Sequence, residues 1–280
     1  MRLTVLLDNN TLIDRYFLGE PGVSYLIEES GKRILFDTGY SDAFIKNAYK
    51  MKTDLLDLDH IVLSHAHLDH TWGLDAISRL FTEAKIEGNA HRDPTVVAHP
   101  LVFNTRTYEG LGEAGTLVCA QKLSRIFRLQ LSSEPLWLTE NVVFLGEIPR
   151  VFDFEHEPLA SKVIIDGKEE DDKLIDDSAL AVKTDVGLVI VTGCSHSGIC
   201  NIIEYAKDIC GEERVRDVIG GLHLLRPTDS RIRGTIEYFR KLRPEEVHAC
   251  HCTDLDSKIA LSKICNVKEV GSGLRLEYTC

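Results

Sequence analysis

Short apolar runs bounded by turn residues alternate with longer stretches of helical periodicity along much of the chain. In the first third, four runs have the length and composition of strands: RLTVLL, VSYLIEE, RILFD and LDHIVLS. Residues 41–51 open with Ser41, a candidate N-cap, and continue with apolar residues near helical spacing. A second helix is predicted over 72–82, where four apolar residues share one face: Leu74, Ile77, Leu80 and Phe81.

The last hundred residues have an equally regular pattern. Residues 179–193 read as two strands that turn between Asp185 and Gly187. Helices and strands then alternate, with helices predicted for ICNIIEYAKDIC, RIRGTIEYFRKL and DSKIALSKIC and strands for RVRDVIGGLHL, EEVHACHC and EVGSGLRLEY. The β-rich start and this later succession predict an α/β fold in which helices cover mixed sheets.

The segment between them, from about 90 to 178, is less regular. It holds five of the eight prolines, weak strands such as NVVFLGE, and the acidic run DGKEEDDKLIDD at 166–177. We expect this run to form a solvated loop, as charge runs usually do. The whole chain, 1–280, is interpreted as a single domain in which about 90–178 is an irregular insert near the functional site.

The composition and net charge limit the classes of molecule that the protein is expected to bind. A chain of 280 residues that is 44% hydrophobic can bury a large core. Its net charge of −12 repels nucleic acid and acidic membrane surfaces, so we expect a small-molecule substrate, no nucleic-acid partner and no membrane partner. The apolar run between Arg2 and Asp8 is too short for a signal peptide, which favours the cytoplasm, and the eight cysteines are interpreted as reduced thiols.

The stretch LSHAHLDHTWGL, residues 63–74, carries the strongest chemical signal. It places His65, His67, Asp69 and His70 within six positions after an apolar strand. Burying such groups without partners is unfavourable, and a metal ion would satisfy them. Zn²⁺ takes about four ligands, so further ligands must come from elsewhere. Candidates at or beyond predicted strand ends, where α/β proteins assemble their sites, are His196, His223 and His251.

The H-x-H-x-D-H pattern after an apolar strand resembles the signature of the metallo-β-lactamase superfamily. That resemblance implies a four-layer αβ/βα sandwich with a one- or two-metal site at the sheet edge. FDTG resembles the early aspartate motif of the superfamily, which would make Asp37 a residue that steadies the ligand loops. One branch is favoured by LLDNNTLIDR, GEIPRVFDFE, TGCSHSGICNII, GGLHL and HCT. It is the group around the 7,8-dihydropterin-6-methyl-4-(β-D-ribofuranosyl)aminobenzene 5′-phosphate synthases.

The resemblance also implies roles for individual residues. One ion would be held by His65, His67 and His196, and the other by Asp69, His70 and His251, with Asp69 and His196 as catalytic residues. Cys194 stands where many members place a carboxylate that bridges the metals, so Cys194 or solvent would bridge here. Two positions depart from the branch, which usually has glycine in place of Trp72 and of Asp254. Residues that could contact a substrate are Trp72, Arg150 and Glu155, although Trp72 could equally pack over the first helix.

Three functions follow from such a site. The branch resemblance implies a condensation in which an arylamine nitrogen attacks the methylene carbon of a dihydropterin diphosphate. The alternatives are a metallohydrolase of an ester, lactone, thioester or phosphodiester, and a metal-binding sensor without catalysis. Each requires one or two divalent ions, with Zn²⁺ favoured over Mn²⁺ or Fe²⁺.

Overall fold

Two large β-sheets lie face to face in the computed structural model, which describes residues 1–108, 110–156 and 161–280. The first sheet has the order β16 (Arg275–Glu277), β1 (Arg2–Leu7), β2 (Ser24–Glu29), β3 (Lys32–Phe36), β4 (His60–Val62), β5 (Thr95–Ala98) and β7 (Arg128–Leu131). From β16 to β3 the strands pair antiparallel, and from β3 to β7 they pair parallel.

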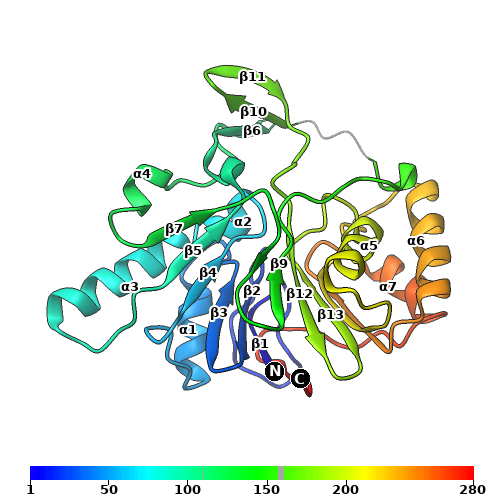
Figure 1. Cartoon of the computed structure of the whole chain (residues 1–280), viewed down its shortest axis with the longest axis horizontal. Coiled ribbons are helices and arrows are strands. Elements are labelled where there is room, and N and C mark those ends of the chain that lie inside the picture. Colours follow the sequence, from blue (N-terminus) through cyan, green and yellow to red (C-terminus); the bar gives the residue numbers. More distant parts are fainter. Residues whose placement is uncertain (109, 157–160) are drawn as a thin grey trace.

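The second sheet has the order β15 (Glu246–Cys250), β14 (Val215–Gly221), β13 (Gly187–Thr192), β12 (Ala179–Thr184), β9 (Val142–Phe144) and β8 (Leu136–Trp137). Strands β13, β14 and β15 run parallel to one another, which places their carboxyl ends at one edge. A small third sheet projects from the sandwich and consists of β11 (Lys168–Asp171), β10 (Ser161–Ile165) and β6 (Arg106–Tyr108) (Figure 1).

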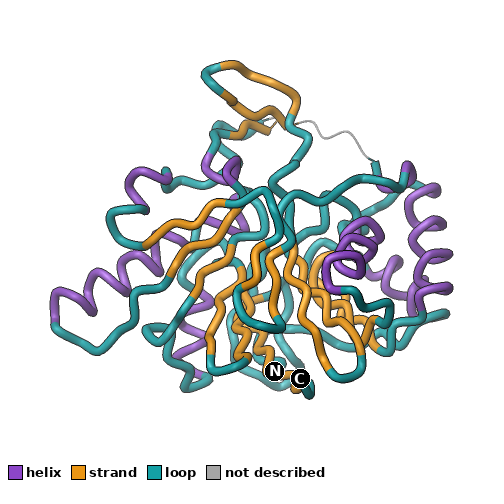
Figure 2. Tube along the Cα trace, in the orientation of Figure 1, coloured by secondary structure: helices purple, strands orange, loops and turns teal. Residues whose placement is uncertain are grey.

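Helices cover the outer faces of both sheets (Figure 2). Those on the side of the first sheet are α1 (Ala43–Lys50), α2 (Leu68–Thr71), α3 (Leu74–Glu87) and α4 (Ala120–Leu123). Those on the side of the second sheet are α5 (Ile199–Cys210), α6 (Asp229–Leu242) and α7 (Leu255–Ser262). Short 3₁₀ turns occupy Pro100–Phe103 and Asp153–Glu155. The predicted α/β class and the four-layer αβ/βα sandwich are therefore confirmed. Among the helices of the described residues, none has the length and apolar character needed to cross a membrane.

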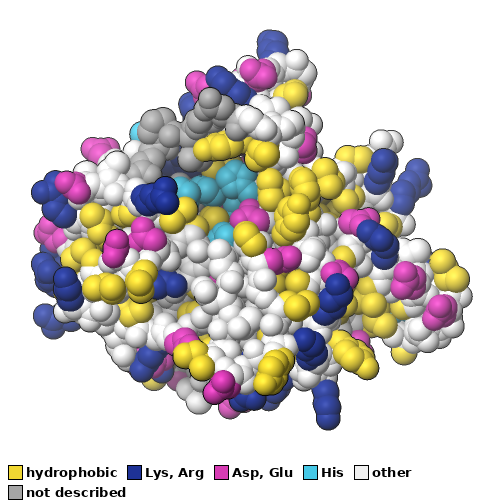
Figure 3. Space-filling model, turned by 180° about the vertical axis from the view of Figure 1, so that it is seen from behind, with side chains coloured by type: hydrophobic (Ala, Val, Ile, Leu, Met, Phe, Trp, Pro, Cys, Tyr) yellow, Lys and Arg dark blue, Asp and Glu magenta, His cyan; other side chains and the backbone are white. Residues whose placement is uncertain are grey.

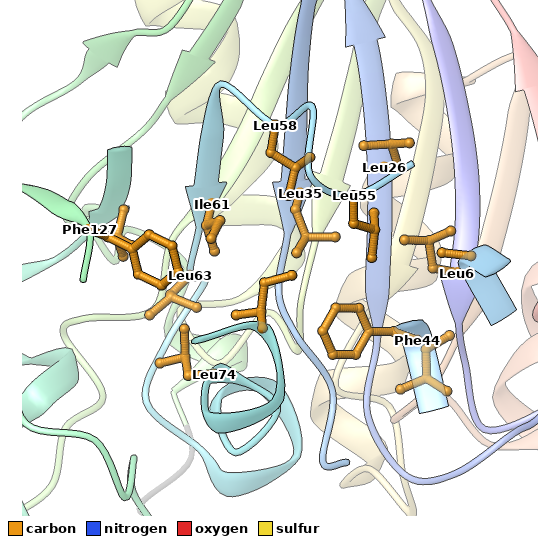
Figure 4. Close-up of a cluster of buried hydrophobic side chains, with 14 of the residues drawn as sticks. Leu6, Leu26, Leu35, Phe44, Leu55, Leu58, Ile61, Leu63, Leu74 and Phe127 are labelled. Atoms are coloured by element: carbon orange, nitrogen blue, oxygen red, sulfur yellow. The ribbon is translucent and has the colours of Figure 1, made fainter. Parts of the chain in front are cut away.

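The alternation of side chains along the strands explains the layers. In β2, Tyr25 and Ile27 point into the core between the two sheets, whereas Leu26 joins the core beneath the helices of the first sheet. Figure 4 shows Leu26 in that second core, together with Phe44 of α1 and Leu74 of α3. Strands with apolar residues on both faces must be covered on both faces, so each sheet lies between its helices and the other sheet.

The middle of the chain is more ordered than its sequence indicates. Strands β5 and β7 belong to the first sheet, and β8 and β9 belong to the second. The acidic run 166–177 is not simply a solvated loop, because it forms the exposed strand β11 and then buries Asp172, Asp176 and Asp177. The expectation of a solvated loop was wrong because the local charge density does not reveal Arg106, a distant cation that pairs with Asp172 and Asp176.

Candidate metal centre

The histidines of the 65–70 loop and those of the second half of the chain converge at one edge of the sandwich. His65, His67 and His70 follow β4, while His196 and His251 follow β13 and β15. Carboxyl ends of strands from both sheets meet at this edge, which is where α/β proteins assemble sites. Figure 3 shows histidine side chains gathered in a hollow on one face of the molecule.

Three imidazoles form the first group. The Nε2 atom of His65 lies 3.1 Å from the Nδ1 atom of His67. The ring centroid of His196 lies 4.8 Å from that of His65 and 4.7 Å from that of His67. Two imidazole nitrogens that face each other at this separation repel through their lone pairs unless a proton or a cation lies between them. The arrangement therefore suits a bound cation.

The second group adds a carboxylate. The Nε2 atoms of His70 and His251 are 3.2 Å apart. The Oδ2 atom of Asp69 lies 3.5 Å from Nε2 of His251 and 3.9 Å from Nε2 of His70. This set of two nitrogens and one oxygen is of the kind that zinc and other divalent first-row metals accept.

Cys194 lies between the two groups. Its Sγ atom is 3.0 Å from Nε2 of His251 and 3.4 Å from Nε2 of His70. It also lies within 4.8 Å of a ring nitrogen of His65 and of one of His196. The side chain is only 5% exposed. The thiol thus occupies the position between the groups at which a bridging ligand is expected.

Asp37 orients two of the imidazoles. Its Oδ2 atom accepts a hydrogen bond from Ser64 Oγ at 2.7 Å and lies 2.7 Å from Nδ1 of His70. Since Ser64 donates its only hydroxyl proton to Asp37, its oxygen must accept from Nδ1 of His65, 2.8 Å away. In their neutral, metal-binding form both histidines therefore carry their proton on Nδ1, and the lone pair of Nε2 is directed at the centre.

Asp8 and Asn9 hold His251, and neither is among the predicted site residues. Asn9 Oδ1 accepts from the Nδ1–H of His251 at 2.8 Å, which again leaves the lone pair on Nε2. Asp8 Oδ1 accepts from the backbone N–H of His251 at 3.1 Å. Both residues belong to the motif LLDNNTLIDR, so the signal was present as a branch motif without an assigned role.

The backbone around the centre is strained and tightly packed. Four residues other than glycine have positive φ angles there: Asp37 (57°), Ser195 (59°), His223 (52°) and His251 (50°). Such angles are unfavourable for L-residues and cluster at functional sites. Gly193 is required for a different reason, since a Cβ atom at this position would lie 2.2 Å from Ser64 Oγ. The end of β13 can approach the Asp37–Ser64 pair only without a side chain.

The electrostatics of the centre keep most of its imidazoles neutral. Burial, reinforced by the neighbouring imidazoles, holds the pKa of His65 and of His196 well below the ordinary value. Burial likewise lowers the pKa of His67 to about 4. Burial alone would lower the pKa of His70 too, but Asp69 and Asp37 outweigh it and raise that pKa to about 9. Neutral imidazoles are the form that binds metals.

His196 gives the clearest indication that a group is needed to complete the centre. Both of its ring nitrogens are buried, and neither has a hydrogen-bond partner among the described residues. An unsatisfied buried polar atom costs about 1–3 kcal/mol, so such atoms persist where something else satisfies them. The donor set and this unpartnered imidazole together fit a divalent metal ion.

A buried ion network connects the third sheet to the metal loop. Arg106 is 1% exposed and donates to Asp172 at 2.9 Å and to Asp176 at 2.7 Å. Asp176 in turn accepts from the backbone N–H of Ala66, between His65 and His67, at 3.0 Å. The acidic run therefore buries its carboxylates to hold the ligand loop in place.

A cavity of about 290 Å³ lies beside this centre. His67 and Asp69 form part of its wall, and the rest is mainly apolar, with Pro21, Leu68 and Leu111 among the lining residues. Tyr108, at the end of β6, also lines the cavity and is 48% exposed. Apolar side chains exposed beside polar groups are typical of ligand sites.

The three predicted substrate residues have other contacts. The indole N–H of Trp72 donates to Gly115 O at 2.8 Å and its ring stacks on Tyr40, which favours the packing alternative. Glu155 is 2% exposed and accepts from the backbone N–H groups at the start of α5, so it is corrected from a substrate residue to a helix cap. Arg150 is exposed and donates to Leu174 O at 2.9 Å, and its role toward a substrate stays a prediction.

Comparisons with known proteins agree with this architecture. The family model of the metallo-beta-lactamase superfamily matches residues 18–209. A solved structure described as a metal-dependent hydrolase of the beta-lactamase superfamily is 28% identical, with a TM-score of 0.83 over 100% of both chains. Because this match covers the whole chain, it includes every strand and loop that carries a predicted metal ligand.

Two relatives come from Methanocaldococcus jannaschii. One is the 7,8-dihydropterin-6-methyl-4-(beta-D-ribofuranosyl)-aminobenzene-5'-phosphate synthase, 34% identical over 250 residues, which cover 85% of this chain and 82% of the synthase. The other is an uncharacterized protein, 30% identical over 268 residues, which cover 94% of this chain and 95% of the relative. The extent of these matches shows that the chain belongs to the metallo-β-lactamase superfamily.

Proposed function

We propose that this protein is a metal-dependent enzyme that joins an aminobenzene ribotide to a dihydropterin diphosphate. The observation that carries the proposal is the 34% identity to the aminobenzene-phosphate synthase over 85% of this chain. The arrangement of the centre supports it, because two groups of histidines lie beside a cavity, and Asp69 lies next to one of these groups.

In the proposed reaction the arylamine nitrogen attacks the methylene carbon of the pterin. The new C–N bond forms, the C–O bond to diphosphate breaks, and the nitrogen loses one proton. A divalent ion bound at the centre would stabilise the negative charge that develops on the departing diphosphate. The surrounding residues keep His65 and His70 oriented through Asp37 and Ser64, so little reorganisation is needed during the reaction.

The cavity supports a substrate with a flat ring. Pro21, Leu68 and Leu111 offer apolar contacts, and the aromatic ring of Tyr108 offers a surface for stacking. Because His67 and Asp69 line the same cavity, a ring bound there would hold its reactive substituent next to the metal groups.

Hydrolysis is the second candidate. It is favoured by the 28% identity and full-length match to the metal-dependent hydrolase structure. The two reactions differ in the nucleophile, an arylamine or a water molecule, and both place a developing oxyanion at the centre.

Diphosphate release in the presence and absence of the arylamine separates the candidates. The purified chain is loaded with Zn²⁺, Mn²⁺ or Fe²⁺ and given a dihydropterin diphosphate, and the products are identified by mass spectrometry. Condensation predicts a coupled product and diphosphate release that requires the amine. Hydrolysis predicts release without the amine, or turnover of chromogenic phosphodiesters or lactones. Turnover of neither class with any of the metals would contradict both candidates and favour a metal-binding sensor.

A ligand variant with a matched control tests the centre itself. His65→Ala should bind less metal than wild type and lose activity, whereas His91→Ala, which alters an exposed histidine, should keep both. Unchanged metal content in His65→Ala would show that His65 is not a metal ligand.

A further inference from the structure

A second set of metal-binding side chains lies at the ends of three neighbouring strands. Strands β13, β14 and β15 pair in parallel, so their carboxyl ends lie at the same edge. Cys194, His223 and Cys252 are each the second residue after one of these strands. The topology therefore brings two thiols and one imidazole together from distant parts of the sequence.

The three side chains are close enough to bind one ion. Their two Sγ atoms and one ring nitrogen of His223 all lie within 4.8 Å of one another. Bonds of about 2.3 Å to sulfur and about 2.0 Å to nitrogen place the ligand atoms of a tetrahedral zinc ion roughly 3.3–3.8 Å apart. Small side-chain rotations would bring the set to that spacing.

The loops around the set are fixed by short contacts. The backbone N–H of His223 donates to Cys252 Sγ at 3.3 Å, and the Cys252 thiol donates to Cys194 O at 3.4 Å. Gly221 N donates to Gly193 O at 3.0 Å, which joins the ends of β13 and β14. A Cβ atom on Gly221 would lie 2.6 Å from Cys252 Sγ, so glycine at this position leaves room for the thiol.

His223 supplies an independent indication of a ligand. Its Nδ1 atom is buried and has no hydrogen-bond partner among the described residues. Its ring centroid lies 4.3 Å from that of His196, which places it against the first imidazole group. Its backbone has φ of +52°, a conformation that needs support from the surrounding structure.

We propose that Cys194, His223 and Cys252 form a thiolate-containing metal site contiguous with the histidine groups. Two thiolates and one imidazole select borderline or soft cations such as Zn²⁺ or Fe²⁺ and leave a fourth position open. Cys194 belongs both to this set and to the position between the histidine groups, so an ion here would share its thiolate with them. This site does not rest on the proposed condensation, because metal binding alone tests it.

Cobalt binding reports thiolate ligands directly. The reduced, metal-free full-length chain is titrated with Co²⁺, and the thiolate-to-cobalt charge-transfer absorption is recorded in the near ultraviolet. Wild type should show this band. Cys252→Ser should lose roughly half of its intensity, as one of two thiolates is gone, and the ions bound per chain should fall by about one. Cys210→Ser, a buried cysteine on α5, is the matched control and should change neither.

Two other outcomes of the cobalt titration would contradict the proposed site. A Cys252→Ser chain with the wild-type band and stoichiometry would leave Cys194 as the sole sulfur ligand. Absence of the band in wild type would show that neither Cys194 nor Cys252 binds the ion. His65→Ala should keep the band while it loses activity, which separates failure of this site from failure of the proposed function.

A measurement on wild type alone covers the case in which Cys252→Ser does not fold. Native alkylation with iodoacetamide, with and without Zn²⁺, is read by mass spectrometry at each cysteine. Zn²⁺ should protect Cys252 severalfold, while exposed Cys119 and Cys280 react equally in both conditions. Equal alkylation of Cys252 with and without Zn²⁺ would contradict its role as a ligand.

Discussion

The imidazoles of the centre differ in how the protein supports them. The outer nitrogens of His70 and His251 each face a side-chain acceptor, Asp37 Oδ2 at 2.7 Å and Asn9 Oδ1 at 2.8 Å. Neither nitrogen of His196 has such a partner among the described residues. The folded chain itself holds the first two rings in orientation, whereas His196 has no such support among the described residues and is expected to gain its missing interaction from a bound ion. Removing a supporting residue and removing His196 should therefore have different consequences.

Asp37→Ala should cause the largest loss. Three groups would lose their acceptor: the backbone N–H of Ser64, its hydroxyl, and Nδ1 of His70. Breaking one partner of a buried charged network costs about 3–5 kcal/mol, so the free energy of unfolding of the metal-free chain should fall by about that amount. Urea denaturation followed by circular dichroism measures it. Asp208→Ala, at an exposed position of α5, should stay within about 0.5 kcal/mol of wild type. An equally small loss in Asp37→Ala would show that water replaces the carboxylate.

Asn9→Ala should affect metal binding more than folding. Asn9 is exposed, so its removal leaves few buried groups unsatisfied, but it releases the ring of His251. Loss of a hydrogen-bond partner behind a metal-binding histidine lowers affinity by about 10–100-fold, and the lower end is expected here because water can replace the amide. Competition with a chromophoric chelator measures the affinity. Asn10→Ala, at the next position, should bind metal as wild type does, and equal affinity in Asn9→Ala would mean that His251 needs no support.

The same distinction between local and distant information decides what the sequence could predict. The apolar run of β2 and the helical spacing of α3 are local, and both elements were predicted from them. The H-x-H-x-D-H cluster is local as well, so His65, His67 and His70 stood out at once. Cys252 did not, because its neighbours in space, Cys194 and His223, follow other strands.

The prediction that the acidic run 166–177 forms a solvated loop was wrong for the same reason. Its charges indicate a solvated loop only while Arg106, some sixty residues earlier, is left out of consideration. Once β6 and β10 pair, Arg106 meets Asp172 and Asp176 and makes their burial possible. The role of Glu155 depends on distant residues too. Its carboxylate accepts hydrogen bonds from backbone N–H groups at the start of α5, and no sequence motif reveals that contact.

His196→Ala should change the stability of the metal-free chain least. The substitution removes two buried nitrogens without partners, and the gain from that offsets part of the packing lost with the ring, so the free energy of unfolding should stay within about 1 kcal/mol of wild type. With Zn²⁺ at about one hundred times its Kd, wild type should gain about 2.7 kcal/mol, and the variant should gain less because it lacks one ligand. Urea denaturation with and without Zn²⁺ gives all four values. If His196→Ala destabilises the metal-free chain as strongly as Asp37→Ala does, then the folded protein supports His196 through contacts of its own, and the contrast between the two kinds of imidazole disappears.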